Sequence, residues 1–256
     1  MYEEKHSMKS WCKYAGALAV LSLVGLALLY SGAAVGAAAG GEITGTIKLD
    51  GKPAKQRPID MSKDPQCAQQ HKGNPAKTET VVVGPYGGLQ YAVVSITEGL
   101  PEGAANAVPS QPVTFDQKGC MYQPHVVALD VGQQLKVTTS DPTKHNIHAL
   151  PAAGTGNIGW NITQIPGSTP VETTWKAPEA IQVKCWIHPW MHGYMVVVKG
   201  PYAVSDDKGS YTIDNVPPGD YTLTAWQETY GAQTQKVTVA SGKSATADFT
   251  FKASKQ

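Results

Sequence analysis

From Gly41 onward, apolar and polar residues alternate with a period of two, and turn residues interrupt the alternation at short intervals. Successive side chains of a β-strand point to opposite faces, so this pattern is typical of half-buried strands. Charged residues make up only 16% of the chain, which also contains 26 glycines and 18 prolines. That composition suits short strands joined by turns better than long helices with many ion pairs. The sequence therefore predicts an all-β fold.

Turn residues divide the pattern into short predicted strands. These cover residues 42–49, 81–83, 91–97, 113–115, 126–131, 134–139, 181–185, 194–199, 210–213, 221–226, 235–239 and 245–251. Between the first two of them, Pro53–Ala76 is polar and rich in turn residues. We therefore expect a long surface loop there, with Cys67 inside it.

The first forty residues predict an exported protein. Tyr14–Gly41 carries no charge, lysines precede it, and its apolar part leads into Ala37-Ala38-Ala39. A basic start, an apolar middle and a small-residue end indicate a signal peptide over residues 1–40, with a hydrophobic helix. The alternative is an uncleaved membrane anchor over residues 14–40, because this segment is long enough to span a bilayer. Both interpretations predict a periplasmic or otherwise extracytoplasmic location.

Charge and missing motifs exclude several classes of function. The formal net charge is +1, which excludes the basic footprint of a nucleic-acid-binding protein. From the sequence we find no glycine-rich phosphate loop, no HExxH, no CxxC and no nucleophilic serine elbow. We therefore do not expect an enzyme.

Two short segments contain the residues that suggest chemistry. Cys185-Trp-Ile-His188-Pro-Trp-Met191 follows a predicted strand, and His145-Asn146-Ile-His148 lies forty residues upstream. A tight loop after Cys185 would bring His188 and Met191 back over the cysteine before the next strand begins. One thiolate, two imidazoles and a thioether form a soft site with a weak axial sulfur, which selects copper for electron transfer. No ligand position is obviously left open for a substrate.

The pattern Cys185-x-x-His188-Pro-x-Met191-x-Gly193, with His145-Asn146 upstream, resembles the ligand elements of the cupredoxins, and amicyanin in particular. The resemblance implies one mononuclear type 1 copper site with ligands His145, Cys185, His188 and Met191. It also implies single-electron transfer with a redox protein such as a c-type cytochrome or a periplasmic oxidoreductase. Asn146 would tie the two ligand loops together through its amide. His188, beside a proline and a tryptophan, would be the ligand at the solvent edge.

Some assignments at this site stay open. His145 and His148 lie on opposite faces of an extended segment, and the family pattern favours His145. Met195 could replace Met191 as the axial sulfur, although its position in the return strand is typical of a core methionine. His192 could be a ligand, but it is expected to be an exposed residue near the metal. The sequence leaves the roles of His125, His148 and His192 undecided.

Cysteine count supports a reduced, metal-binding Cys185. Cys12 lies in the leader, so Cys67, Cys120 and Cys185 remain. In an oxidising compartment two cysteines pair, and the third needs a reason to stay reduced, such as a metal. Cys67 and Cys120 most simply form a disulfide. The alternative is a second metal site that uses Cys120 and His125.

A second resemblance suggests how the chain is organised. Glu42–Pro53 and Tyr91–Ile96 resemble the first two strands of a carboxypeptidase regulatory-like (prealbumin-like) sandwich, and Val204–Trp226 resembles later strands. The resemblance implies a discontinuous sandwich of residues 41–107 and 200–256, with a cupredoxin Greek-key domain of residues 108–199 inserted. Two further hypotheses of function are a copper-delivery protein and a structural β-sandwich module with a vestigial site.

Overall fold

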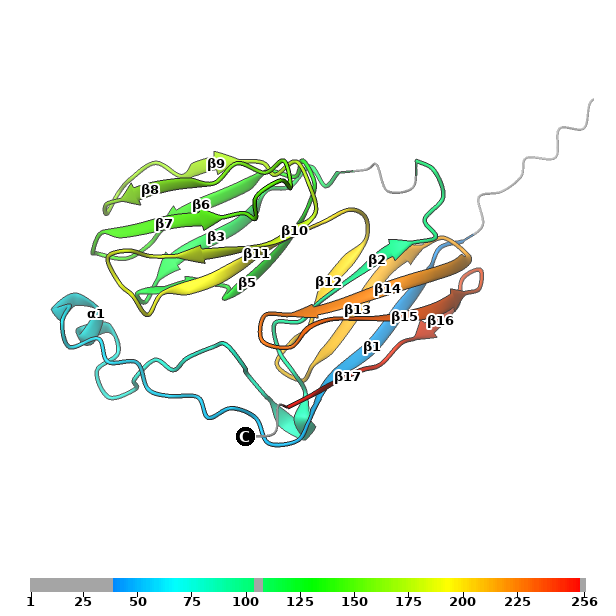
Figure 1. Cartoon of the computed structure of the whole chain (residues 1–256), viewed down its shortest axis with the longest axis horizontal. Helices are drawn as coiled ribbons and strands as arrows, with labels where there is room; N and C mark the ends of the chain where they lie inside the picture. The colour runs from blue at the N-terminus through cyan, green and yellow to red at the C-terminus, as the bar shows by residue number, and fades with distance from the viewer. Residues whose placement is uncertain (1–38, 104–107, 254–256) are drawn as a thin grey trace, which may run out of the picture. The chain divides into compact units, whose positions relative to one another are not determined.

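The computed structural model describes residues 39–103 and 108–253 (Figure 1). The predicted signal peptide or anchor, with its hydrophobic helix, therefore lies outside the described residues except for its last two positions. No helix within the described ranges has the length and apolar character needed to cross a membrane. All of the described residues belong to one compact unit.

The protein is all-β, which confirms the fold class predicted from the sequence. The described residues form one short α-helix, α1 (Pro65–Gln70), one 3-10 turn, η1 (Pro85–Gly87), and strands β1 to β17. The strands are β1 (Gly41–Asp50), β2 (Val93–Glu98), β3 (Val113–Lys118), β4 (Met121–Gln123), β5 (Val126–Asp130), β6 (Leu135–Thr139), β7 (His145–Leu150), β8 (Trp160–Gln164), β9 (Val171–Thr173), β10 (Glu179–Lys184), β11 (His192–Val198), β12 (Tyr202–Val204), β13 (Ser210–Val216), β14 (Gly219–Gln227), β15 (Gly231–Val239), β16 (Ser244–Thr246) and β17 (Phe249–Lys252).

These strands form four sheets. One sheet has the order β5-β11-β10-β7-β8, and another has the order β4-β3-β6-β9. Their inward side chains form a core around Phe115, Leu129, Leu135, Ile147 and Ile181. The other two sheets are β13-β1-β16, with β17 also paired to β1, and β12-β2-β14-β15. The predicted domain boundaries, 108–199 inside 41–107 and 200–256, stay a prediction.

The second pair of sheets has its own core, and a smaller cluster joins the two. Ile43, Leu223 and Phe251 belong to the second core. Val93 of β2 packs with Val126 and Val196 of β5 and β11 in the joining cluster. Valines on both faces of β11 make this possible, because alternate side chains reach opposite sides of a strand.

The structure departs from the predicted strands in several places, and β4, β7, β8, β9 and β12 were not among the predicted strands. Residues 81–83 form only a single bridge, from Val83 to Leu89, instead of a strand. Residues 245–251 divide into β16 and β17, which both pair with β1 in parallel. β7 was not predicted, because His145 and Asn146 interrupt the apolar alternation although both are buried. Polar residues are buried without penalty only when other groups satisfy them, and the sequence does not show those groups.

The segment 53–76 lies mostly at the surface, as expected, but it is not entirely a loop. It contains α1, and Figure 1 shows this helix on a long excursion between β1 and β2. Asp64 caps the helix by accepting hydrogen bonds from the amides of Gln66 and Cys67, and Pro65 occupies its first turn. Cys67 is fully buried. Met61 is buried as well, but most of the segment is exposed, so it lies at the surface as expected and is anchored at these two residues.

Candidate metal centre

Three of the four predicted ligands meet at one end of the five-stranded sheet. His145 begins β7, Cys185 directly follows β10, and His188 lies in the loop before β11. Their donor atoms all lie within 4.8 Å of one another. The two imidazoles face each other, with 3.0 Å between their Nδ1 atoms, and Cys185 Sγ lies 4.0 Å from His188 Nδ1. All three side chains are buried.

Hydrogen bonds between residues close in sequence close the loop that follows Cys185. The Met191 amide donates to the His188 carbonyl at 2.9 Å, and the Cys185 amide donates to the Met191 carbonyl at 3.1 Å. The His188 amide also donates to Cys185 Sγ at 3.3 Å. These contacts hold the loop closed over the cysteine. They also supply a hydrogen bond that stabilises negative charge on its sulfur.

Asn146 connects the two ligand elements. Its backbone N–H donates to Cys185 Sγ at 3.4 Å, and its side-chain oxygen accepts a hydrogen bond from the backbone N–H of Trp186 at 3.2 Å. Its side-chain nitrogen donates to the carbonyl of Ile162 in β8 at 3.2 Å. Asn146 thus bridges the strand that holds His145 and the loop that holds His188.

Two carboxylates orient the imidazoles, and sequence reasoning missed both. Asp141 Oδ2 lies 2.8 Å from His145 Nε2, and Asp64 Oδ2 lies 3.0 Å from His188 Nε2. An ionised carboxylate can only accept hydrogen bonds, so each Nε2 carries a proton, and whenever a ring is neutral its Nδ1 holds the lone pair. The Nδ1 lone pairs then face each other and the cysteine sulfur. Such an arrangement is repulsive unless a proton or a metal cation lies between these atoms.

The pKa values of Cys185 and His145 agree with a site that favours a positive charge, a proton or a metal cation, between its donor atoms. Burial alone would raise the pKa of Cys185, but hydrogen bonds from His145, His188 and two backbone amides lower it to about 6. Burial alone would lower the pKa of His145, but Asp141 and the Cys185 sulfur raise it to about 9. At neutral pH the site therefore holds a thiolate, the form of cysteine that binds metals.

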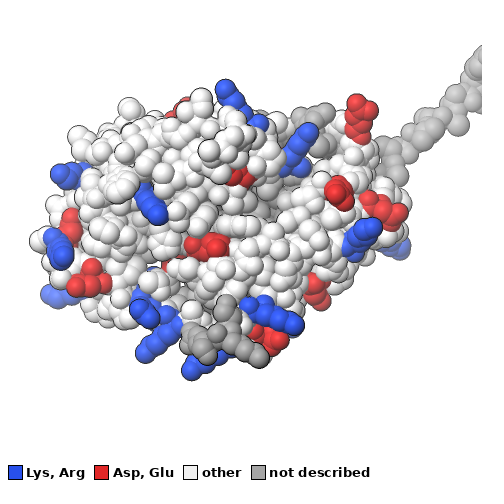
Figure 2. All heavy atoms as spheres, viewed as in Figure 1, with Lys and Arg blue, Asp and Glu red and all other residues white. Residues whose placement is uncertain are grey.

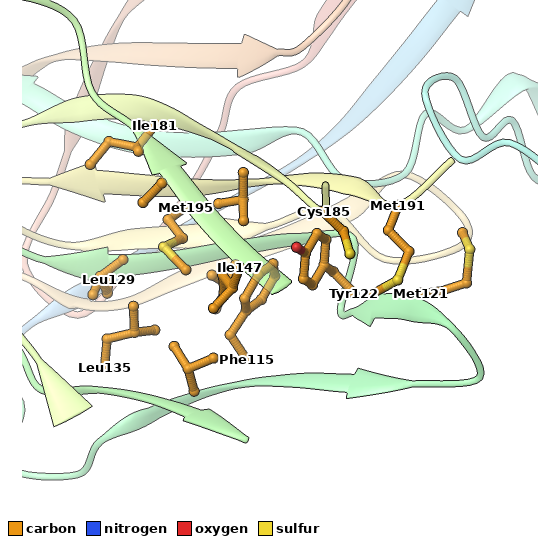
Figure 3. Close-up of a cluster of buried hydrophobic side chains, with 14 of the residues drawn as sticks. Phe115, Met121, Tyr122, Leu129, Leu135, Ile147, Ile181, Cys185, Met191 and Met195 are labelled. Carbon is orange, nitrogen blue, oxygen red and sulfur yellow. The ribbon is translucent and has the colours of Figure 1, made fainter. Parts of the chain in front are cut away.

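Met191 lies at the same end of the core as Cys185, whereas Met195 does not (Figure 3). Met191 is 1% exposed, and Figure 3 shows Met191 and Cys185 at one end of the buried cluster, away from Leu129, Leu135 and Ile181. Met195 lies in β11 opposite Ile181 of β10, within the strand pairing. It has the environment of a core residue. The fourth predicted ligand, Met191, is therefore in the ligand loop and buried.

His188 is covered, and the expectation that it lies at the solvent edge is wrong. Its side chain is 2% exposed. Asp64 and Cys67 of the α1 segment lie against its Nε2, with Cys67 Sγ at 3.7 Å. Cys67 forms a disulfide with Cys120, and this bond ties the segment to the turn before β4. Trp190 packs on the imidazole from another direction, with 5.1 Å between ring centroids. The loop sequence alone could not reveal this cover, because the cover comes from more than a hundred residues upstream.

The remaining histidines lie outside this centre. His148 points away from it and accepts a hydrogen bond from Trp186 Nε1 at 2.7 Å. His125 Nε2 and Glu228 Oε1 are 2.6 Å apart. Because Cys120 is in the disulfide, the alternative metal site of Cys120 and His125 lacks its thiolate. His192 lies with His125 and Glu228.

An open groove reaches the cysteine, and none of the residues that cover His188 lines it. It has a volume of about 480 Å³ and is lined by Gln182, Lys184, Cys185, Trp186, Pro189 and His192. Trp186 is 68% exposed. The candidate centre thus approaches solvent beside the cysteine, not at His188.

Comparisons with known proteins give a partial picture of the family. A model of the carboxypeptidase regulatory-like domain matches residues 193–252, which is less than half of the chain. The matched segment runs from β11 to β17. No curated protein matches the sequence.

Solved structures of copper proteins are weakly similar to this chain. A copper-containing nitrite reductase from Thermus scotoductus SA-01 has a TM-score of 0.31 and 22% identity, over 40% of this chain and 25% of that one. An oxidised amicyanin variant has a TM-score of 0.31 and 18% identity, over 41% of this chain and 98% of that one. A purple cupredoxin from Nitrosopumilus maritimus has a TM-score of 0.27 and 19% identity, over 33% and 98%. The chain thus spans about a quarter of the nitrite reductase. Similarities of this size carry no argument about function, which has to rest on the residues of the site.

Proposed function

We propose that this protein carries single electrons through one type 1 copper ion held by His145, Cys185, His188 and Met191. The observation that carries the proposal is the 3.0 Å approach of the two Nδ1 atoms, each ring having its Nε2 on a carboxylate. Thiolate, thioether and imidazole together suit both Cu(I) and Cu(II), so bound copper supplies a one-electron couple. The buried loop holds the donor atoms in place in both states.

The set of side chains favours a carrier over an enzyme. Four ligands from a closed loop and a buried strand leave no coordination position for a substrate. The disulfide supports an oxidising, extracytoplasmic location. The cover over His188 favours retention of the metal, which argues against a delivery protein. The test is voltammetry of the copper-loaded protein, where one reversible one-electron couple supports the proposal. Irreversible loss of copper to a chelator, without such a couple, would contradict it.

The redox partner would meet the protein at the groove beside Cys185. The covered face of His188 is closed to a partner, whereas exposed Trp186 directly follows the cysteine. Short-lived complexes between redox proteins bury small surfaces. On the face drawn in Figure 2, acidic and basic side chains are interspersed, without one dominant sign. Among the described residues, Lys184 is the one lysine, arginine or acidic residue that lines the groove, so apolar contact with Trp186 and Pro189 would contribute more there than long-range charge attraction. We propose a c-type cytochrome or a periplasmic oxidoreductase as the partner.

Replacing Trp186 with alanine is expected to weaken binding of the partner without changing the copper spectrum. A tryptophan that anchors an interface contributes about 2 kcal/mol, or about 30-fold in affinity. The measurement is the rate of electron exchange with a c-type cytochrome as a function of cytochrome concentration. Trp190→Phe is the matched control, because Trp190 packs on the covered side of His188. If the rate is unchanged in Trp186→Ala, the redox partner does not bind at the groove beside Trp186.

Replacing Met191 with leucine is expected to keep the thiolate colour and to raise the reduction potential. The thioether is a weak donor to Cu(II), so its loss destabilises the oxidised state relative to the reduced one. Voltammetry and an optical spectrum measure both effects. Met195→Leu is the control and should change neither, since Met195 lies within the strand pairing of β10 and β11. If Met191→Leu has the same potential as the parent protein, Met191 is not the axial ligand.

A further inference from the structure

A second group of metal-binding side chains lies beside the first. His125 lies between β4 and β5, His192 begins β11, and Glu228 directly follows β14. One donor atom of each lies within 4.8 Å of the others. His125 Nε2 is 2.6 Å from one oxygen of Glu228, and His192 Nε2 is 3.9 Å from the other. None of these residues belongs to the proposed copper centre.

The hydrogen bonds of His125 are incomplete. The residue is 1% exposed, and its Nδ1 is buried without a hydrogen-bond partner within residues 39–103 and 108–253. The nearest acidic group is Glu79, whose Oε2 lies 4.0 Å away. A buried polar atom without a partner costs about 1–3 kcal/mol, so it needs an explanation.

The second imidazole has a free lone pair directed at the group. His192 Nδ1 lies 3.3 Å from the carbonyl of Trp190, which accepts hydrogen bonds only. The proton is therefore on Nδ1, and Nε2 faces Glu228 with its lone pair. Thr80 Oγ1 lies 3.4 Å from the same Nε2 and can donate to it while no metal is bound.

The two carboxylates at this group form no ion pair with lysine or arginine of the described residues, although Lys184, opposite His192 in the strand pairing, is close enough to add to burial and His125 in lowering the pKa of His192. Glu79 and Glu228 form ion pairs with histidine only, and the described residues supply neither with lysine or arginine. Burial raises the pKa of Glu79, and the opposing effect of His125 does not cancel this. Two carboxylates that share one histidine would be stabilised by a divalent cation.

We propose that His125, His192 and Glu228 bind one divalent transition-metal ion, separate from the copper centre. Two imidazoles and a carboxylate are ligands typical of zinc and related ions, and three protein ligands leave a position open for water or a small anion. The 2.6 Å His125–Glu228 contact has to open, because tetrahedral ligands at about 2.1 Å from a metal lie roughly 3.4 Å apart. With its Nε2 on the metal, His125 would carry a proton on Nδ1 and donate it in a hydrogen bond to Glu79, once the Glu79 side chain closes the present 4.0 Å gap. This arrangement would give His125 Nδ1 the hydrogen-bond partner that no described residue offers it without the metal.

The ion would link elements that share no sheet. His125 and His192 flank strands of the β5-β11-β10-β7-β8 sheet, whereas Glu228 follows a strand of the β12-β2-β14-β15 sheet. His192 also lines the groove that reaches Cys185, which offers the ion a route from solvent. The proposal does not depend on the electron-carrier function, because the ligands of the two centres are different residues.

The test counts bound zinc in protein already loaded with one equivalent of copper. Zn²⁺ is added by equilibrium dialysis, and elemental analysis gives copper and zinc per chain. We expect about one zinc in the parent protein and less than about a tenth in His192→Ala and Glu228→Gln, because each loses one of three ligands. His148→Ala is the matched control, a partly exposed histidine of the same sheet outside the group, and should still bind about one zinc. A Cys185→Ala variant should also bind one zinc, which separates this site from the copper site.

Thermal unfolding gives a second readout. A ligand that binds the native state raises the unfolding temperature, and at a hundred times its dissociation constant zinc would stabilise by about 2.7 kcal/mol. The parent protein and His148→Ala should show this shift, and His192→Ala should not. Circular dichroism checks that each variant is folded. The proposal is overturned if copper-loaded parent protein binds no zinc, or if folded His192→Ala and Glu228→Gln retain it.

Discussion

Replacing Cys185 with serine is expected to abolish the intense visible absorption of the copper-loaded protein. That absorption requires a thiolate bound to Cu(II), and Cys185 is the free cysteine of the described residues. A serine hydroxyl is not ionised at neutral pH, so it supplies neither the charge nor the soft sulfur. Loss of a direct ligand should weaken copper binding by more than about 100-fold, since loss of a residue that merely supports a ligand already costs 10–100-fold.

The measurement is an optical titration of the folded variant with copper. Cys185 is buried and serine is of similar size, so circular dichroism should be unchanged. Met195→Leu is the control and should keep its colour, because it alters a core sulfur and no ligand. If the Cys185→Ser variant is still strongly coloured, the absorption does not come from the Cys185 thiolate, and Cys185 is not the copper ligand that we propose.

Removing the disulfide, with Cys67→Ser and Cys120→Ser together, is expected to open the cover over His188. The bond joins residues 53 positions apart, and the loss of a crosslink of that span costs about 2–5 kcal/mol of unfolding free energy. The α1 segment would then no longer be tied to the turn before β4. Asp64 would lose its position on His188 Nε2, and solvent and chelators would reach the imidazole. We expect copper loss to a chelator to become at least about tenfold faster, because the orienting carboxylate is lost as well.

Two measurements separate the effects of the tether and the carboxylate. Denaturant unfolding gives the change in stability, and chelator competition gives the rate of copper loss. Asp64→Asn is the matched control, because it keeps the disulfide and removes only the negative charge of Asp64 beside His188. It should lose copper more slowly than the double variant. If the double variant retains copper as the parent does, the α1 segment does not protect the centre.

The ligand motif was accessible from the sequence because its spacing is local. Cys185, His188 and Met191 lie within one short loop, and a strand before it and a strand after it fix the direction of that loop. The all-β fold was equally accessible, because the period-two alternation depends on neighbouring residues. β7 was missed although it holds His145, because the polar residues that begin it are buried only through partners elsewhere in the chain.

The carboxylates and the cover depended on long-range contacts. Asp141 precedes His145 by four residues, a spacing that could have suggested their hydrogen bond. Asp64 gave no such signal, since it lies 124 residues from His188 and looks like a helix cap in a loop. The same holds for Glu228 and His125, which are 103 residues apart. Sequence patterns indicate which face of an element is buried, but not which distant side chain covers it.

The most direct test is an electron paramagnetic resonance spectrum of the protein loaded with one equivalent of Cu(II), recorded together with its visible absorption. If His145, Cys185, His188 and Met191 hold the ion, the hyperfine splitting along the main axis should be small and the visible band intense, because the unpaired electron is shared with the thiolate sulfur. A large splitting with only weak visible absorption would mean that nitrogen and oxygen atoms alone bind the copper, and this result would contradict the account.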